Sequence, residues 1–291
     1  MDFLVSVILA LLKRNPLNKN EGNRHAKRDW KKRAPVFSFS KAVFALGLAF
    51  LFIPLFVIVF YSFNSSEGSQ FTGFSFRWYE ELFLKSGKLW KSLLYSGIVA
   101  LASALISTVL GSLAAIGISW YKFFGKNYIQ SISFLPMVLP EVIMGVSLLI
   151  FLSGIHMNLG ITTIIIAHTT FCLPFVYLMV SSRVDEFDYS IIEAAYDLGA
   201  NEKQTLLHVI LPAIAPGIIS GFMMSVTMSI EDFVITSLVN GNIETLPISV
   251  YNMIRHGVSP VINSLSFILI LFILLLAIVL RKSLKSFAAA K

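Results

Sequence analysis

Charged residues are scarce in this sequence. They make up 13% of the 291 residues, whereas hydrophobic residues make up 56%, and the mean hydropathy is +0.78. A soluble domain of this length carries about 25% charged residues. Long apolar runs with so few charges are typical of integral membrane proteins, and the composition therefore predicts an all-α integral membrane fold.

The motifs of common enzymes are also missing. Cysteine occurs once, at Cys172, so the chain can form neither an internal disulfide nor a cysteine-based metal site. There is no HExxH metal motif, no GxSxG elbow and no GxxxxGK[ST] phosphate loop, because Gly87-Lys88 and Gly125-Lys126 lack the upstream glycine and the following hydroxyl. We predict that the chain is not an enzyme, needs no cofactor, and relies on another polypeptide for any ATP hydrolysis.

Basic residues gather near the N-terminus. Ten of the 23 Lys and Arg residues lie between Lys13 and Lys41, before the first long apolar run. This distribution is typical of a cytoplasmic anchor against anionic lipid, and we expect a membrane lipid partner rather than nucleic acid. We predict a basic cytoplasmic N-terminal segment over 1–40, a transmembrane domain over 41–291, and an interfacial helix at Met1–Leu12.

Six apolar runs are long enough to cross a bilayer. Pro136 and Pro140 fall inside the third, where proline removes a backbone hydrogen bond and kinks a helix, and Pro212 opens the fifth. With the N-terminus inside, the cytoplasmic segments hold 18 Lys and Arg residues and the outer segments five, which predicts that both termini are cytoplasmic. The predicted spans are Lys41–Phe63, Ser92–Trp120, Ile129–Ser153, Leu159–Ser182, Ala213–Val239 and Val261–Leu280.

Small residues recur at three- and four-residue spacing along the second span. Such a stripe lets another helix approach closely, and we expect it to pack inside this subunit rather than to line a transport pathway. Its members are Gly97, Ala100, Ala104, Ser107, Gly111 and Ala115.

The loop between the fourth and fifth spans, Arg183 to Pro212, combines six acidic residues with regularly spaced apolar ones. The pattern predicts helix, turn, helix, in which Gly199 ends the first helix and Asn201 caps the second. An amphipathic helix pair on the cytoplasmic face must bury its apolar side against the membrane surface or a soluble partner.

The same loop carries a family resemblance. The stretch EAAYDLG from Glu193 to Gly199 is followed, after nine residues, by Val209-Ile210-Leu211-Pro212. It resembles the EAA loop of ABC importer permeases and departs from that pattern only at Val209, where isoleucine is usual. The resemblance implies a type I ABC importer permease fold with six transmembrane helices and a cytoplasmic coupling helix. The implied coupling residues are Glu193, Ala194, Ala195, Asp197, Gly199 and Pro212.

Further partners follow from that resemblance. It implies two copies of an ABC ATPase subunit, a second permease subunit, and an extracytoplasmic binding protein that delivers substrate near Asn240–Pro260. The location implied is the bacterial inner membrane.

Two acidic sites lie within the apolar spans. Glu141 is in the third span, and Glu231 and Asp232 are in the fifth. A carboxylate costs several kcal/mol to bury in lipid, so we interpret these residues as candidates for a substrate pathway. No Lys or Arg lies inside a span to pair with them, which suits an amine cation. Alternatively, hydroxyls, waters or a partner chain stabilise them and they serve packing.

From about Phe44 onward the chain also looks like the spermidine/putrescine permeases. The most similar stretches are Leu139–Ile143, Phe171–Phe175, Ser229–Phe233 and His256–Pro260. The resemblance implies polyamine import, through an extracytoplasmic polyamine-binding protein, with Glu141, Glu231 and Asp232 on the pathway. Two alternatives remain: an ABC permease for another small solute, and a secondary transporter, which would leave the EAA-like loop unexplained.

Three further residues have expected roles. We expect His168 to be a satisfied helix-contact group, because it shares a helix face with Phe171. Trp78 and Tyr79, in the first outer segment, are expected in the interfacial aromatic belt.

Overall fold

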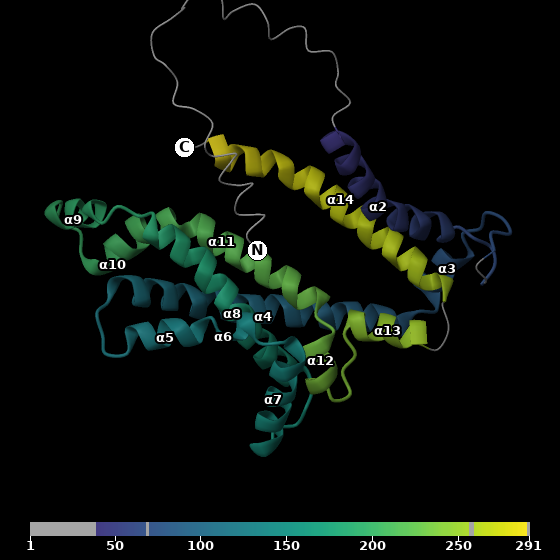
Figure 1. Ribbon diagram of the computed structural model, residues 1–291, viewed down its shortest axis with the longest axis horizontal. Helices are drawn as coiled ribbons and strands as arrows, with labels where there is room; N and C mark the ends of the chain where they lie inside the picture. Colours follow the sequence, from purple (N-terminus) through teal and green to yellow (C-terminus); the bar gives the residue numbers. More distant parts are fainter. Residues whose placement is uncertain (1–38, 68–69, 256–258, 290–291) are drawn as a thin grey trace, which may run out of the picture. The chain divides into compact units, whose positions relative to one another are not determined.

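The computed structural model describes residues 39–67, 70–255 and 259–289. The predicted helix Met1–Leu12 and nearly all of the predicted basic segment lie outside the described residues. So does His256-Gly257-Val258, in one of the stretches that resemble polyamine permeases. The described helices are α2 (Phe39–Tyr61), α3 (Arg77–Leu84), α4 (Gly87–Trp120), α5 (Lys126–Ser133), α6 (Leu135–Val138), α7 (Glu141–Gly154), α8 (Ile161–Asp185), α9 (Ser190–Asp197), α10 (Glu202–Thr205), the π-turn η1 (Leu206–Ile210), α11 (Leu211–Glu231), α12 (Val234–Val239), α13 (Leu246–Arg255) and α14 (Pro260–Ala289) (Figure 1).

The chain divides into two compact units, residues 1–56 and 57–291. In the first, the described residues belong to the apolar helix α2, which contains Pro54. The second holds the other helices. Across the described residues, five helices are long and apolar enough to span a membrane, and a sixth span is added if the bent pair 126–138 and 141–154 counts as one. This agrees with the six predicted spans.

The third predicted span is broken rather than kinked. Its two halves meet at an angle of 110°. Leu139 and Pro140 are both extended, with ψ of 137° and 134°, because a residue before proline avoids the helical region and proline supplies no N–H. Glu141 therefore becomes the first residue of α7, where the helix dipole favours a carboxylate.

The fifth predicted span differs at both ends. A continuous helix begins at Glu202, runs through η1 and ends at Glu231. Pro212 therefore lies inside this helix instead of opening it. At the other end the chain leaves the helix at Asp232, which is extended, and starts again as α12 at Val234.

Helices α4, α8 and α11 pack closely together at the centre of the larger unit (Figure 1). Five members of the small-residue stripe on α4 are buried, and Gly97 is half-buried, which confirms packing inside this subunit. Val176 of α8 sits where the three helices meet. A Cβ added at Gly111 of α4 would lie 2.8 Å from the Val176 Cβ, and one added at Gly221 of α11 would lie 3.2 Å from the Val176 Cα.

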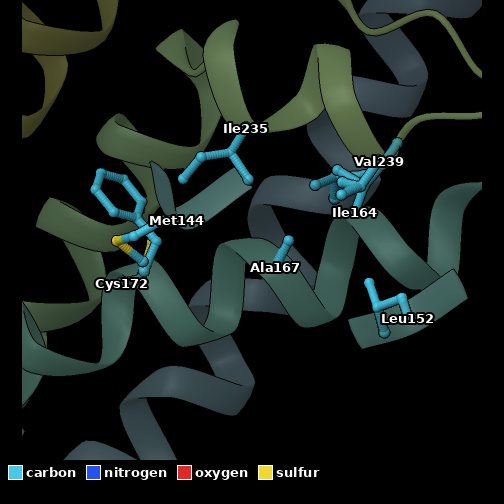
Figure 2. Close-up of a cluster of buried hydrophobic side chains, with 9 residues drawn as sticks. Met144, Leu152, Ile164, Ala167, Cys172, Ile235 and Val239 are labelled. Carbon is cyan, nitrogen blue, oxygen red and sulfur yellow. The ribbon is translucent and has the colours of Figure 1, made fainter. Parts of the chain in front are cut away.

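A second part of the core joins α7, α8 and α12. Figure 2 shows Ile164, Ala167 and Cys172 of α8 beside side chains from the other two helices. Gly145 allows the closest approach, because a Cβ there would lie 2.5 Å from the Cδ1 atom of Leu238. This packing holds the first turn of α7 near the break at Asp232.

The segment between α2 and α4 is part of the larger unit and packs within it. Trp78 is 2% exposed, and its indole Nε1 donates to the Asn64 carbonyl at 2.6 Å. Trp78 is therefore a core residue, and its expected place in an interfacial belt is wrong. The Tyr79 hydroxyl hydrogen-bonds Ser62 at 2.7 Å, and partial burial raises the pKa of Tyr79.

Candidate functional site

The acidic residues of the two spans line one pocket. Its volume is about 320 Å³, and Glu141 from the start of α7 meets Glu231 and Asp232 from the end of α11 there. The two breaks in the spanning helices create this arrangement, because each places a carboxylate at a helix end. The remaining lining residues are Phe171, Met228, Phe233 and Val234.

Two of the carboxylates are available to a ligand. The side chains of Glu141 and Glu231 are exposed. Within the described part of the chain, neither has a hydrogen-bond or ion-pair partner. Their carboxylates can therefore accept hydrogen bonds from a guest.

Asp232 is bonded to the protein instead. It is 7% exposed, and its Oδ2 atom accepts from the Thr236 backbone N–H at 2.8 Å and from the Thr236 hydroxyl at 2.7 Å. Its Oδ1 atom accepts from the Ile235 N–H at 3.3 Å. These bonds cap the first turn of α12. The expectation that Asp232 is unpaired is wrong, because hydroxyl, backbone and histidine groups replace the missing Lys or Arg.

His168 supplies the histidine contact from the middle of α8. It is 1% exposed, and its Nε2 atom lies 3.2 Å from Asp232 Oδ2 and 2.8 Å from Thr236 Oγ1. Its Nδ1 atom lies 2.6 Å from Ser229 Oγ, which in turn lies 3.1 Å from Ser103 Oγ on α4. The expectation of a satisfied helix contact is confirmed. The shared face with Phe171 was the only sign that His168 stands so close to the pocket.

The pocket has the chemistry of a site for an organic cation. Two exposed carboxylates can each accept hydrogen bonds from an ammonium group, and charge-assisted bonds of this kind are stronger than neutral ones. Phe171 and Phe233 also line the pocket, and aromatic rings can attract a cation that lies over their faces. No Lys or Arg is among the lining residues. Among the described residues, no group of three or more His, Cys, Asp and Glu side chains could hold a metal ion.

The loop between α8 and η1 has the predicted helix–turn–helix form. Gly199 follows α9 with φ of +85°, the Ala200 N–H bonds the Ala195 carbonyl at 3.0 Å, and the Gly199 N–H bonds the Tyr196 carbonyl at 2.9 Å. These are the two bonds of a Schellman motif. Asn201 and Gln204 exchange side-chain and backbone bonds of 2.9 Å as a capping box. The expectations for Gly199 and Asn201 are confirmed.

One face of α9 is exposed, and Ile192 and Ala195 on the other face are buried. Glu193, Ala194 and Asp197 face away from the rest of the chain, and Leu198 beyond them is 89% exposed. Ala195 is 8% exposed and faces the core, so of the two implied coupling alanines only Ala194 lies on the exposed face. Before α9, the Ser190 backbone N–H donates to Asp188 Oδ1 at 3.0 Å and holds the pKa of that exposed carboxyl below its usual range.

Comparisons with known proteins match most of the chain. A family model described as "Binding-protein-dependent transport system inner membrane component" matches residues 107–288. The spermidine/putrescine transport system permease protein PotC of Haemophilus influenzae is 36% identical over 244 residues, which are 83% of this chain and 95% of that protein. The putrescine transport system permease protein PotI of Escherichia coli K12 is 39% identical over 233 residues, 77% of this chain and 83% of that protein.

A solved structure shows the same fold. A bacterial ABC transporter involved in the import of the acidic polysaccharide alginate contains a chain that superposes with a TM-score of 0.62. The alignment covers 87% of this chain and 99% of that one, at 16% sequence identity. At that identity the likeness concerns the type I permease fold alone.

Proposed function

The chain belongs to the family of binding-protein-dependent transport system inner membrane components, and from this membership we propose that it carries polyamines into the cytoplasm as one permease subunit of an ABC importer. A multi-pass permease of this family is not an enzyme, and ATP is hydrolysed by a separate subunit. Family membership also removes the alternative of a secondary transporter.

The pocket between α7 and α11 carries the substrate proposal. Polyamines present ammonium groups along an apolar methylene chain. The exposed carboxylates of Glu141 and Glu231 suit the ammonium groups, and the Phe171 and Phe233 rings suit both the cations and the methylenes. The relatives named for spermidine/putrescine and putrescine transport support the same substrate class. An anionic solute of the same transporter class would require basic lining residues.

We assign the ATPase contact to α9. Its exposed face at Glu193, Ala194 and Asp197, extended by Leu198, would dock on the ATPase, and the Gly199 turn would hold α9 and α10 as one unit. Ala195, on the buried face of α9, would pack against the rest of the chain and hold the helix in place. In this proposal the assembly holds two ATPase copies, a second permease and an extracytoplasmic polyamine-binding protein, and both termini are cytoplasmic.

A single helix would connect the proposed ATPase contact near α9 to the pocket. The helix Glu202–Glu231 contains 30 residues and is therefore about 45 Å long. One end follows the Gly199 turn, and the other carries Glu231 into the pocket. A movement of α9 on ATP binding would thus pass through the Gly199 turn and then along one continuous helix, through Pro212 and α11, to the pocket wall, which suits an alternating-access mechanism.

The test is ATP-dependent uptake of labelled spermidine into vesicles that contain the assembled complex. Glu141→Gln and Glu231→Gln should each reduce uptake at least about tenfold, because each removes a charge-assisted bond. Glu80→Gln, an exposed acid on α3 outside the pocket, is the matched control and should leave uptake unchanged. An assembled complex that hydrolyses ATP but takes up no spermidine would exclude the substrate while leaving the permease class in place.

A further inference from the structure

One exposed face of α11 carries polar side chains along the second half of the helix. Ser220 and Thr227 are exposed on this face, as are Met224 between them and Glu231 at its end. At 3.6 residues per turn, Ser220, Met224 and Thr227 all point within about 40° of the direction of Glu231. This hydroxyl stripe, Ser220 to Glu231, therefore starts at the pocket and runs along α11 toward the end that follows the α9 turn.

A second exposed stripe on α11 is apolar. Ile219 and Ile230 are exposed, with the half-buried Val226 between them. This apolar stripe lies about 100–140° around the helix from Glu231 and suits lipid or another apolar helix. Polar side chains within a spanning segment face the protein interior or a water-filled pathway instead. Because Ser220 and Thr227 are exposed in this chain, their position favours a pathway along α11.

Both hydroxyls of the stripe already use their hydrogen. The Ser220 hydroxyl donates to the Pro216 carbonyl at 2.8 Å, and the Thr227 hydroxyl donates to the Met223 carbonyl at 3.0 Å. A hydroxyl has one hydrogen and two lone pairs, so each oxygen has only acceptor capacity left for a solute. An ammonium group has donors alone, whereas a carboxylate has acceptors alone. The hydroxyl stripe therefore suits a cation and offers no free hydrogen to an anion.

Resting on the proposed function, we propose that Thr227 and Ser220 are pathway residues that accept hydrogen bonds from the ammonium groups of the polyamine as it moves from the pocket toward the cytoplasm. Thr227 lies about 6 Å from Glu231 along the helix axis, and Ser220 lies about 10 Å further. An ammonium that leaves Glu231 finds an acceptor oxygen at each of these levels, in place of part of its lost hydration. Neither oxygen carries a full charge, so each holds the ammonium less strongly than the Glu231 carboxylate does.

The first test measures ATP-dependent uptake of labelled spermidine by the assembled complex in vesicles. Thr227→Val has nearly the same shape but no acceptor oxygen, and it should lower the maximal uptake rate about three- to tenfold while ATP hydrolysis is retained. Thr227→Ser keeps the oxygen and should stay within about twofold of wild type. Thr169→Val is the matched control and should also stay within about twofold, because the Thr169 hydroxyl likewise bonds its own helix, at 2.7 Å to the Ile165 carbonyl, but is buried.

Thiol labelling tests the position of the hydroxyl stripe without relying on transport. The only cysteine of the chain, Cys172, is buried, so introduced cysteines can be followed against a low background. In the assembled complex in lipid nanodiscs, a water-soluble cationic thiosulfonate reagent should label Ser220→Cys and Thr227→Cys, and excess spermidine should slow this labelling. Ile219→Cys and Ile230→Cys on the apolar stripe should react at least about tenfold more slowly, because a thiol in apolar surroundings forms little of the reactive thiolate.

The outcomes are distinct. Equal uptake by Thr227→Val and Thr227→Ser, where the wild-type complex imports spermidine, overturns the inference and leaves the proposed function standing. Labelling of Ser220→Cys and Thr227→Cys as slow as that of the apolar stripe also overturns it, because the hydroxyls then face lipid or the second permease. If Thr227→Val fails to assemble, Ser220→Ala takes its place in the uptake assay with the same expected loss. A wild-type complex that imports no spermidine overturns the proposed function, and this inference with it.

Discussion

Replacing Gly111 with alanine should loosen the contact between α4 and α8. The added Cβ would lie 2.8 Å from both the Cβ and the Cγ1 atoms of Val176 and 3.1 Å from the backbone nitrogen of Tyr177. A Cβ atom cannot turn away by changing rotamer, so the two helices must separate. Overpacking of this kind costs about 1–3 kcal/mol, and alanine recovers about 1 kcal/mol of helix propensity. The net loss of stability is up to about 2 kcal/mol.

Thermal unfolding of the purified chain in detergent measures this loss. Gly97→Ala is the matched control, because it lies on the same helix with nothing within 4 Å of the added Cβ. We expect Gly111→Ala to unfold at a lower temperature than wild type, and Gly97→Ala at the same temperature or higher. Equal unfolding temperatures for Gly111→Ala and Gly97→Ala would refute the close approach of α4 and α8 at Val176, because both variants gain the same helix propensity and only the first adds the clash.

Three further predictions concern the Gly199 turn, the Trp78 hydrogen bond and the start of α9. Gly199→Ala should lower the spermidine transported per ATP hydrolysed, because φ of +85° costs alanine about 1–2 kcal/mol; an unchanged ratio would contradict a rigid turn. Trp78→Phe should lower the unfolding temperature through loss of the bond to Asn64, worth about 1 kcal/mol; equal temperatures would show that this bond is dispensable. The hydrogen bond from the Ser190 N–H lowers the pKa of Asp188. The bond therefore stabilises the start of α9 fully at pH values above the carboxyl's ordinary pKa of 3.8, and it is lost as the pH falls through the lowered pKa. Asp188→Ala should therefore speed amide exchange at Ser190 at neutral pH and not in strong acid, and equal rates at neutral pH would contradict it.

The turn at Gly199 could be predicted from the sequence because its causes are local. The Schellman bonds and the capping box all join residues no more than five positions apart, between Ala195 and Gln204. The spans could be predicted for a similar reason, since the length and apolar character of a segment decide whether it can cross a bilayer.

The break at Asp232 could not be predicted in this way. The apolar run continues from Phe233 to Val239 and therefore looks like the end of the fifth span. At the break Asp232 accepts from Thr236 and lies 3.2 Å from Nε2 of His168, which comes from another helix. Pattern alone cannot show a partner that tertiary packing supplies.

Trp78 and Pro140 show the same limit. The burial of Trp78 depends on Asn64 and on the hydrophobic cluster it joins with Leu265 of α14. Pro140 predicted a kink, but it did not show the 110° bend or the close approach of Gly145 to Leu238 of α12. Each of these features is decided by residues distant in the chain.

The two helix breaks also decide whether the main chain or the side chains give the pocket its charge. The carbonyl end of α11 reaches the pocket at Glu231, and the amide end of α7 reaches it at Glu141. Their macrodipoles amount to about half a negative and half a positive elementary charge, and the amide end of α12, which also reaches the pocket at Val234, is bonded to the Asp232 carboxylate, so the helix ends nearly cancel. The main chain therefore shows little preference for the sign of a solute. In the proposed substrate pathway the carboxylates would set that sign, and we expect basic residues at the same positions to reverse it without a change of fold.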